Sequence, residues 1–182
     1  MREEYAIVLD FLPNGYPFDT APAHRKAPIV QAVGITKFIL LELVAKKDIH
    51  LRPHDKIYIG DAKRDKIHHI NGKIPESKLT GTARSELPYV IEGVVSENEE
   101  RFVEFFNQAQ PLSMRMHQLE LLPGLGKKHM WEIVNERKAE PFKDFAEIKK
   151  RVSLMPDPKG IVVKRILKEI EGKEKHKIFV RD

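Results

Sequence analysis

The sequence predicts an α+β protein in which a small β-barrel is followed by a helical domain. Up to about Ser96, short runs rich in β-branched and aromatic residues are broken by turn residues, a pattern typical of strands. From Ser96 onward the apolar residues recur at helical spacing, and no long flexible linker separates the two patterns. We therefore expect two domains, at residues 1–96 and 97–182.

Six apolar runs predict the strands of the first domain, at residues 5–11, 29–33, 37–44, 56–60, 67–74 and 89–95. The first two are separated by a Pro-punctuated segment, Leu12 to Pro28. A loop of that length in a compact domain is usually either functional or mobile, and the sequence leaves both alternatives open.

Capping signals predict where the helices of the second domain begin and end. Ser96 and Glu99 form a capping-box pair and open a helix that ends near Pro111. Ser113 can cap a helix that runs to Leu121. The later elements are a helix from Gly126 to about Lys138, one at 145–151 behind Asp144 and Glu147, one at 161–171 stopped by Gly172, and an added strand at 177–180.

The absence of cysteine excludes disulfides, thiolate metal sites and a cysteine nucleophile, and a cytoplasmic location is the simplest expectation. The most apolar stretch, residues 38–45, is too short to span a bilayer and contains Glu42. The charged N-terminus does not resemble a signal peptide. We therefore expect a globular protein that does not enter a membrane.

The positive charge is concentrated near the C-terminus. Residues 112–182 hold 17 lysines and arginines against 11 aspartates and glutamates, whereas the rest of the chain is almost neutral. Such a distribution is expected of a domain that neutralises phosphates, and it is equally expected of a solvated, lysine-rich surface.

The segment Pro123-Gly124-Leu125-Gly126 lies between two helical patterns, and its glycines allow a tight turn and a close approach by another molecule. Gly126 and the residues after it lie at a predicted helix N-terminus, where free N–H groups and the helix dipole favour an anion. Lys127 and Lys128 add positive charge there. Contacts of this kind fix a sugar-phosphate backbone without reading its bases.

Residues 122–128 resemble the helix-hairpin-helix of DNA repair and recombination proteins, whose hallmark is Leu-Pro-Gly-hydrophobic-Gly followed by basic residues. The resemblance implies that Gly124, Leu125, Gly126, Lys127, Lys128 and His129 bind nucleic acid. Met130 departs from it, because this position is usually small. His129 stands where a small polar residue is usual, so it either reaches a phosphate or is solvated.

A Pro-Phe spacer at Pro141 and Phe142 resembles that of tandem helix-hairpin-helix domains, but the second copy, at residues 155–160, lacks the two spaced glycines. We expect this degenerate copy to support the first, with Lys159, Lys164 and Arg165 as flanking contacts. In the same family, backbone carbonyls around the turn can hold a monovalent cation. The matching positions, as weak candidates, are Glu120, Leu122 and Leu125.

The run Arg52 to Gly60 resembles strands of OB-like barrels found in nucleic-acid-binding and translation proteins. It leads into a charged hairpin at 61–66, whose Lys63 and Arg64 either contact a nucleic-acid backbone or are solvated.

Over most of its length the chain resembles an uncharacterised archaeal family, domain of unknown function 655, through the stretch from Arg115 to Gly124. That resemblance implies an OB-like domain followed by a helix-hairpin-helix domain. In this reading Arg115 and His117 either extend the binding face or lie solvated on a helix surface.

No pattern predicts an enzyme, a cofactor or a metal centre. His50 and His54 have no further ligands at fixed spacing, and His68 and His69, as strand neighbours, are expected on opposite faces. We find no phosphate-binding loop or nucleophile motif. The leading hypothesis is a noncatalytic nucleic-acid-binding protein with RNA preferred over DNA. The alternatives are a protein-interaction adaptor of a ribosome, transcription or repair assembly, and an undetected nuclease.

Overall fold

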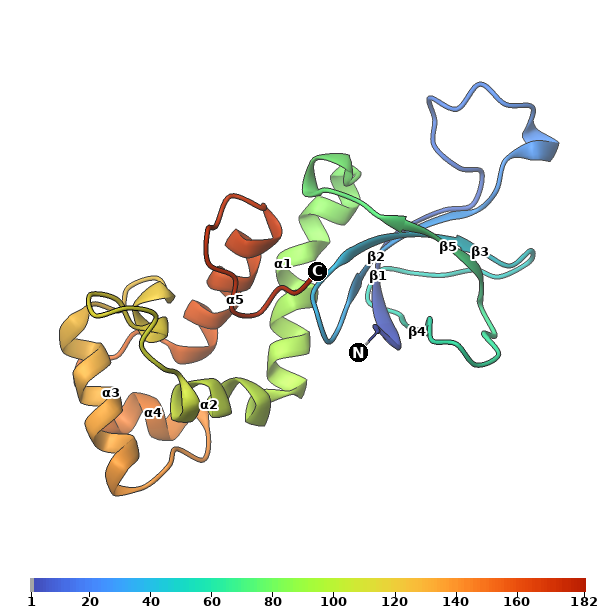
Figure 1. Cartoon of the computed structure of the whole chain (residues 1–182). Helices are drawn as coiled ribbons and strands as arrows, with labels where there is room; N and C mark the ends of the chain where they lie inside the picture. The colour runs from blue at the N-terminus through green and yellow to red at the C-terminus, as the bar shows by residue number, and fades with distance from the viewer. Residues whose placement is uncertain (1) are drawn as a thin grey trace. The chain divides into compact units, whose positions relative to one another are not determined.

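The computed structural model describes residues 2–182, which form two compact units (Figure 1). The first unit comprises the chain up to Val90 with residues 170–173 and 179–182, and the second comprises residues 91–169 and 174–178. Strands occur in the first unit and most of the helical residues in the second. The predicted α+β class is confirmed.

The first unit contains a curled antiparallel sheet whose strands follow the order β4-β1-β2-β3-β5 (Figure 1). The strands are β1 (Tyr5–Leu12), β2 (Ile29–Gly34), β3 (Leu40–Ala45), β4 (Lys56–Tyr58) and β5 (Ile67–Lys73). β4 and β5 form the two edges of this sheet and do not pair with each other. The predicted barrel is therefore an open half-barrel, and residues 61–66 connect its two edges instead of turning a hairpin.

Alternation along the strands gives this sheet its core. Ala6 and Val8 of β1, Val30 and Ala32 of β2, and Leu43 of β3 are fully buried in one apolar cluster. Residues two apart on a strand share a face, so each strand contributes its side chains to the same side of the sheet. The inner face of the half-barrel is thus filled by aliphatic side chains.

Helix α1 (Gly81–Glu97) begins at a buried polar cluster beside the sheet. The Thr80 hydroxyl accepts the N–H of Ala83 at 3.1 Å and donates to Asp10 at 2.6 Å. Gln31, which is fully buried on β2, accepts the N–H of Thr80 at 2.9 Å. Because a side-chain oxygen satisfies an N–H group at the helix start, these contacts fix where α1 begins.

The predicted strand at 89–95 is wrong, because these residues lie in α1. The β-branched run there is buried at Val90, Ile91, Val94 and Val95, which is helical spacing, whereas Tyr89 is exposed. The predicted capping box also fails, since Ser96 lies inside α1. Helix α2 (Glu99–Gln108) begins after Asn98, which makes no side-chain cap.

The second unit continues with a 3-10 helix η3 (Gln118–Leu121) and helices α3 (Lys127–Ala139), α4 (Phe145–Arg151) and α5 (Pro158–Ile170). Asp144 caps α4 by accepting the N–H of Glu147 at 2.7 Å, as predicted. The predicted helix from Ser113 is wrong. Residues 111–117 form a loop closed by a bridge between Pro111 and His117. The short 3-10 helix η3 is the only helical element between this loop and Leu122.

The predicted strand at the C-terminus is also wrong, because residues 177–180 form no strand in the structure. A short 3-10 helix, η1 (Ala23–Arg25), lies in the segment between β1 and β2, and another, η2 (Glu76–Lys78), precedes α1.

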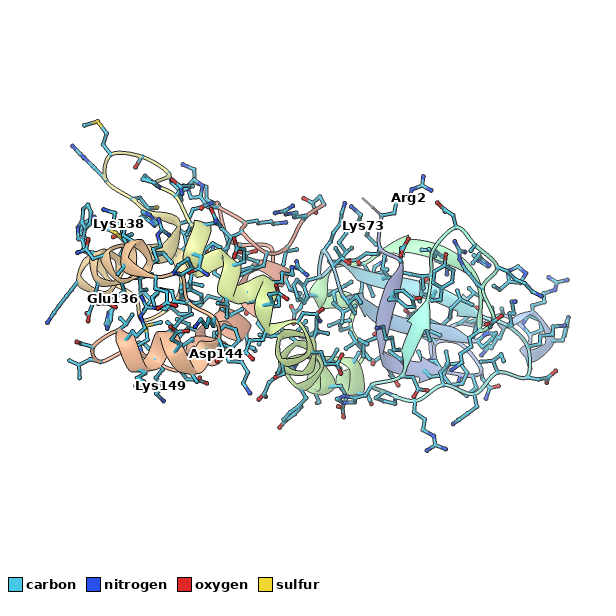
Figure 2. The ribbon with its side chains drawn as sticks, turned by 90° about the horizontal axis from the view of Figure 1, so that it is seen from below. Arg2, Lys73, Glu136, Lys138, Asp144 and Lys149 are labelled. Carbon is cyan, nitrogen blue, oxygen red and sulfur yellow. The ribbon has the colours of Figure 1, made fainter. Side chains whose placement is uncertain are left out.

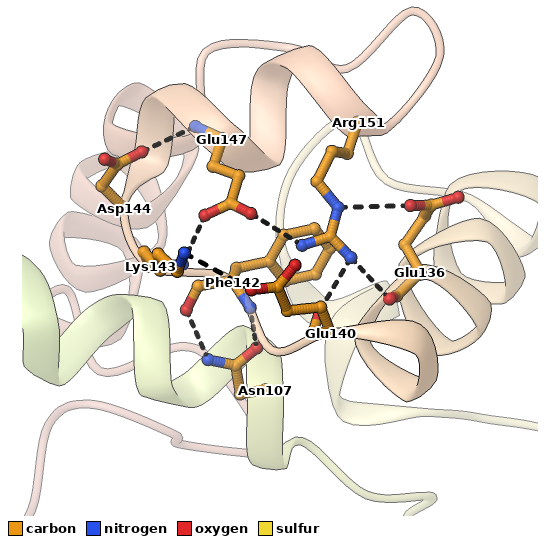
Figure 3. Close-up of polar contacts among 8 residues, drawn as sticks. All are labelled: Asn107, Glu136, Glu140, Phe142, Lys143, Asp144, Glu147 and Arg151. Atoms are coloured by element: carbon orange, nitrogen blue, oxygen red, sulfur yellow. Dashed lines mark hydrogen bonds and ion pairs between the residues drawn. The ribbon is translucent and has the colours of Figure 1, made fainter.

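Arg151 joins α4 to α3 and its C-cap through three hydrogen bonds, and it makes a fourth within α4 (Figure 3). Its guanidinium contacts the carboxylate of Glu136 at 3.2 Å and that of Glu147 at 2.9 Å, and it donates to the carbonyls of Glu136 at 2.6 Å and Glu140 at 2.7 Å. It also lies 4.4 Å from the ring centroid of Phe142. The planar donor fork of arginine thus holds the two helices in one arrangement.

Candidate nucleic-acid interface

The turn between η3 and α3 is tight and its apolar residues are buried. The N–H of Leu125 donates to the carbonyl of Leu122 at 3.2 Å, and both side chains are buried. Gly124 has a φ of +84°, a conformation that is costly for residues with a side chain. A Cβ at Gly124 would lie 3.5 Å from Pro156, so the segment predicted to support the turn lies against it.

The N-terminus of α3 presents donors without partners. Gly126 is the N-cap residue, it offers no side-chain cap, and the space where its Cβ would stand is open. The N–H groups of Lys127, Lys128 and His129 precede the first helical hydrogen bond and meet no acceptor within residues 2–182. An anion can therefore approach this helix end without displacing a protein group.

The three basic side chains at this helix end differ in their partners. Lys127 Nζ lies 3.2 Å from Glu120 Oε1 and donates to the Arg115 carbonyl at 2.9 Å. His129 Nε2 lies 3.1 Å from the carbonyl of Leu154. Lys128 is exposed, and its ammonium group meets no acceptor in the described part of the chain. Lys128 is thus the cation most available to a ligand.

His117 and Glu120 cap η3 reciprocally. His117 Nδ1 accepts the N–H of Leu119 at 3.1 Å, and Glu120 accepts the N–H of His117 at 2.8 Å. This backbone hydrogen bond is the main cause that lowers the pKa of Glu120, and the neighbouring Lys127 lowers it further. Burial lowers the pKa of His117, which is consequently neutral near pH 7. Arg115, two residues earlier, is exposed.

Arg165, predicted as a flanking contact, is buried instead. Its guanidinium pairs with Glu169 at 2.8 Å and Glu174 at 3.1 Å, and it donates to the Leu121 carbonyl at 3.1 Å, at the end of η3. Arg165 therefore stabilises the chain where η3 ends and the turn begins. The spacing of Arg165 and Glu169 on one helix was the signal for this pairing. Lys159 pairs with Glu92 at 3.3 Å.

A groove of about 350 Å³ lies beside the same helix end, between the loop at 111–117 and α3. Its walls include Met114, Met116 and Trp131, which are exposed, together with the largely buried His117. Sequence reasoning did not single out Trp131, although the helical spacing of Met130 and Ile133, which are buried, places Trp131 off the buried face and is a signal that could have found it.

Lys63 and Arg64 belong to the first unit and lie in the connection between β4 and β5. Arg64 donates to the carbonyl of Gly60 at 2.8 Å and lines a cavity of about 570 Å³. Arg2 and Lys73 line the same cavity (Figure 2). This cavity lies where the half-barrel is open, and its charge is balanced, because it is lined by four cations and by four carboxylates, Glu3, Glu4, Asp61 and Asp182.

The other histidines pair locally. His54 Nε2 lies 2.6 Å from Glu86, and the Nδ1 atoms of His68 and His69 are 2.8 Å apart. The expectation that the last two point to opposite faces is wrong, because an irregularity in the pairing of β3 with β5 falls at His68 and interrupts the alternation. Residues 2–182 contain no group of three or more side chains suited to a metal ion.

The carbonyl of Leu122, one of the three weak cation candidates, already accepts the N–H of Leu125. The corresponding assignments for Glu120 and Leu125 stay predictions. No helix in the described residues is both long and apolar enough to cross a membrane.

The fold and the turn together define a class of α+β proteins with an open antiparallel half-barrel and a helical unit that presents a basic helix end. The chain matches the family described as protein of unknown function DUF655 over residues 2–181, and it belongs to that family.

Two relatives cover almost the whole chain. It is 42% identical to the uncharacterised protein MJ0038 of Methanocaldococcus jannaschii over 98% of its own length and 80% of that protein. It is also similar to the crystal structure of Af1531 from Archaeoglobus fulgidus, with a TM-score of 0.91 and 44% identity over 98% of this chain and 100% of that one. The predicted relation to this archaeal family is confirmed.

Proposed function

We propose that this protein binds nucleic acid without catalysing a reaction, and that residues 118–139 act as a helix-hairpin-helix that grips the phosphate backbone. The observation that carries the proposal is the N-terminus of α3, where unpartnered N–H groups, open space at Gly126 and the free ammonium group of Lys128 coincide. Each of these favours a phosphate, and none distinguishes one base from another.

Lys127 contributes in a different way. Its ammonium group is shared between Glu120 and the Arg115 carbonyl, so it adds positive potential at the helix end while it keeps the loop at 111–117 in place. Affinity therefore depends mainly on Lys128 and the backbone donors, and it falls steeply with salt, as expected when lysines displace counterions from phosphates.

In this proposal the half-barrel is OB-like and supplies a second contact surface, on which Lys63 and Arg64 meet the backbone. Arg2, Arg64 and Lys73 line a cavity that opens where a closed barrel would have paired strands, and carboxylates in the same lining balance its positive charge. The resemblance of this unit to OB-like barrels of translation proteins is the reason for preferring RNA over DNA. The competing function is that of a protein-interaction adaptor. It is favoured by the exposed apolar side chains of Leu112 and Met114, which a protein partner could cover.

The test is the salt dependence of binding, measured by fluorescence anisotropy with labelled single-stranded RNA, duplex RNA and duplex DNA. We expect Lys128→Glu to weaken binding to all three probes and to reduce the slope of log affinity against log salt by about 1. Lys127→Glu adds a smaller loss, because Lys127 is already paired. Both effects are expected to be sequence-independent.

Lys149→Glu is the matched control, since it reverses the same charge on α4 of the same unit. Binding that is absent at low salt, or equal losses for Lys128→Glu and Lys149→Glu, would contradict the hairpin grip. An adaptor would instead bind a protein partner after nuclease treatment and would show no affinity for the three probes.

A further inference from the structure

The groove beside α3 exposes apolar surface that the second unit leaves uncovered. Trp131 is 58% exposed, and Met114 and Met116 of the facing loop are also exposed. These three side chains line one hollow of about 350 Å³. Trp131 follows Lys128 by three residues on the same helix, so the indole and the free ammonium group lie on neighbouring positions of the α3 surface.

His117 adds a polar group to the wall of this groove. The residue is only 6% exposed, and its Nδ1 accepts the N–H of Leu119, so the neutral ring carries its proton on Nε2. Nε2 has no hydrogen-bond partner in residues 2–182. Because every buried side-chain nitrogen or oxygen of those residues has a partner, Nε2 is not a buried atom. The Nε2–H is therefore accessible. Because His117 lines the groove, this group can donate a hydrogen bond to a ligand bound there.

The charge around the groove favours an anionic ligand. Arg115, Lys127 and Arg137 line it, and its one carboxylate, Glu120, is already held by Lys127 and by the N–H of His117. An exposed indole, an inward hydrogen-bond donor and a cationic wall together fit a flat heteroaromatic ring that carries a phosphate.

We propose that this groove binds an unpaired base of the nucleic acid, which stacks on Trp131 and accepts a hydrogen bond from His117 Nε2, while the neighbouring phosphates lie at the N-terminus of α3. The inference rests on the proposed function and adds its substrate class, a single strand. Stacking on an aromatic side chain requires a base that is free of its partner strand, so a duplex can occupy the phosphate grip but not the groove.

An exposed methionine-rich surface also suits a protein partner. The nucleotide is favoured by the unpaired Lys128 next to the groove and by the absence of free carboxylates among its lining residues. Every base has a flat face and a hydrogen-bond acceptor, so little base preference is expected.

Trp131 is the only tryptophan of the chain, so its fluorescence reports on this groove alone. The experiment uses the full chain with an oligouridylate of about 12 nucleotides, within the site sizes of about 4–16 common for single-strand binders. An abasic strand of equal length and a duplex serve as comparison probes. We expect the oligouridylate to quench Trp131 emission, whereas the abasic strand and the duplex bind without quenching it.

Trp131→Ala is expected to weaken binding of the labelled oligouridylate by roughly 5- to 150-fold, the range for losing one stacked base, and to leave the abasic strand and the duplex unaffected. Trp131→Phe restores part of the affinity. His117→Asn keeps an acceptor near the position of Nδ1 but loses the Nε2–H, and it is expected to weaken the same complex roughly 2- to 12-fold. The matched control is Tyr89→Ala, which removes another exposed aromatic side chain, on α1.

The outcomes separate the two proposals. If all three probes bind and Trp131→Ala changes none of them, the groove inference is wrong while the phosphate grip stands. If no probe binds at low salt, both are wrong. Quenching of Trp131 by a protein partner, with no response to the oligouridylate, assigns the groove to protein binding and also overturns the inference.

Discussion

Glu120 accepts a hydrogen bond from the N–H of His117 with one oxygen and pairs with Lys127 through the other. The first contact caps η3, and the second offsets part of the positive charge of a lysine at the helix end where we propose that phosphate binds. Glu120→Gln keeps an oxygen for the cap but removes the negative charge. We expect this substitution to tighten nucleic-acid binding roughly fivefold. Two unit charges about 4 Å apart in water interact by about 1 kcal/mol, and we take this as the scale of the repulsion between Glu120 and a bound phosphate.

Anisotropy titrations at low salt measure the gain, and Glu104→Gln, which removes an exposed carboxylate on α2, is the control for net charge. The gain is expected to vanish at high salt because screening weakens both the lost repulsion and the attraction of Lys127 for phosphate. Equal affinity of the Glu120→Gln variant and the native chain at low salt would show that Lys127 does not face the ligand.

The residues of the candidate site were predictable to different degrees. Gly124 and Gly126 stand in a local motif, so their backbone role could be inferred from the sequence. The pairing of Lys127 with Glu120 and the burial of His117 were not, because they depend on a loop between Pro111 and His117 that carries no helical or strand period. For Arg165, the spacing of Glu169 on the same helix was a local signal of pairing, but its partners at Leu121 and Glu174 come from other segments and were not predictable.

The pairing of α3 with α4 depends on Arg151, whose side chain is mostly buried. Arg151→Met keeps a side chain of similar length but loses the guanidinium over Phe142 and its bonds to the Glu136 and Glu147 carboxylates, and it leaves the carbonyl of Glu140 without its side-chain donor. We expect the free energy of unfolding to fall by about 2–3 kcal/mol, as for the loss of hydrogen bonds to a charged group. Chemical denaturation monitored by circular dichroism measures it.

Arg151→Lys keeps the charge but loses the donor fork, and we expect it to recover less than half of the loss. Lys150→Met, which removes an exposed charge next to it, is the matched control and should change the stability little. A stability of Arg151→Met equal to that of Lys150→Met would show that the contacts of Figure 3 do not hold the two helices together.

Helices whose ends carry local signals were predicted closely. Asp144 marks the start of α4, and Gly126 precedes α3. α1 was missed because Pro88 argues against a helix interior and the β-branched residues Val90, Ile91, Val94 and Val95 favour a strand, whereas tertiary burial at helical spacing decides the structure. Ser96 and Glu99 have the residue types of a capping box, but Ser96 lies inside α1 and Glu99 is the first residue of α2.

Five of the six strands predicted for the first domain are found within three residues of their predicted bounds, since each one is a short apolar run between turn signals. Their pairing was not predicted, because it joins segments far apart in the sequence. The half-barrel is open since β4 and β5 lie at opposite edges of the sheet, and no local pattern records that. The positive charge of residues 112–182 was predictable as a total, but its distribution between the free Lys128 and the buried Arg165 required the fold.

The second unit uses carboxylates as caps for backbone N–H groups, and this makes the stability of the protein depend on pH. Glu120, Glu132 and Glu147 accept the N–H groups of His117, Ser153 and Lys143, and these hydrogen bonds are the main reason that the pKa of each is lowered from its ordinary value of 4.5. A carboxyl whose pKa is lower in the folded state stabilises the fold above its unfolded pKa, and that stability is lost as the pH falls through the folded pKa.

We therefore expect the melting temperature to fall slightly below about pH 6.5, where the unfolded state protonates His117, whose pKa burial lowers in the folded state, and to fall further between about pH 4.5 and about pH 2, where the three glutamates titrate. Scanning calorimetry across this range measures it. The triple variant with glutamine at all three positions keeps the cap oxygens without a titrating group, so its melting temperature is expected to be lower at pH 7 and to depend less on pH. If the native chain and the triple variant lose stability in parallel on acidification, the caps are not what makes the fold acid-sensitive.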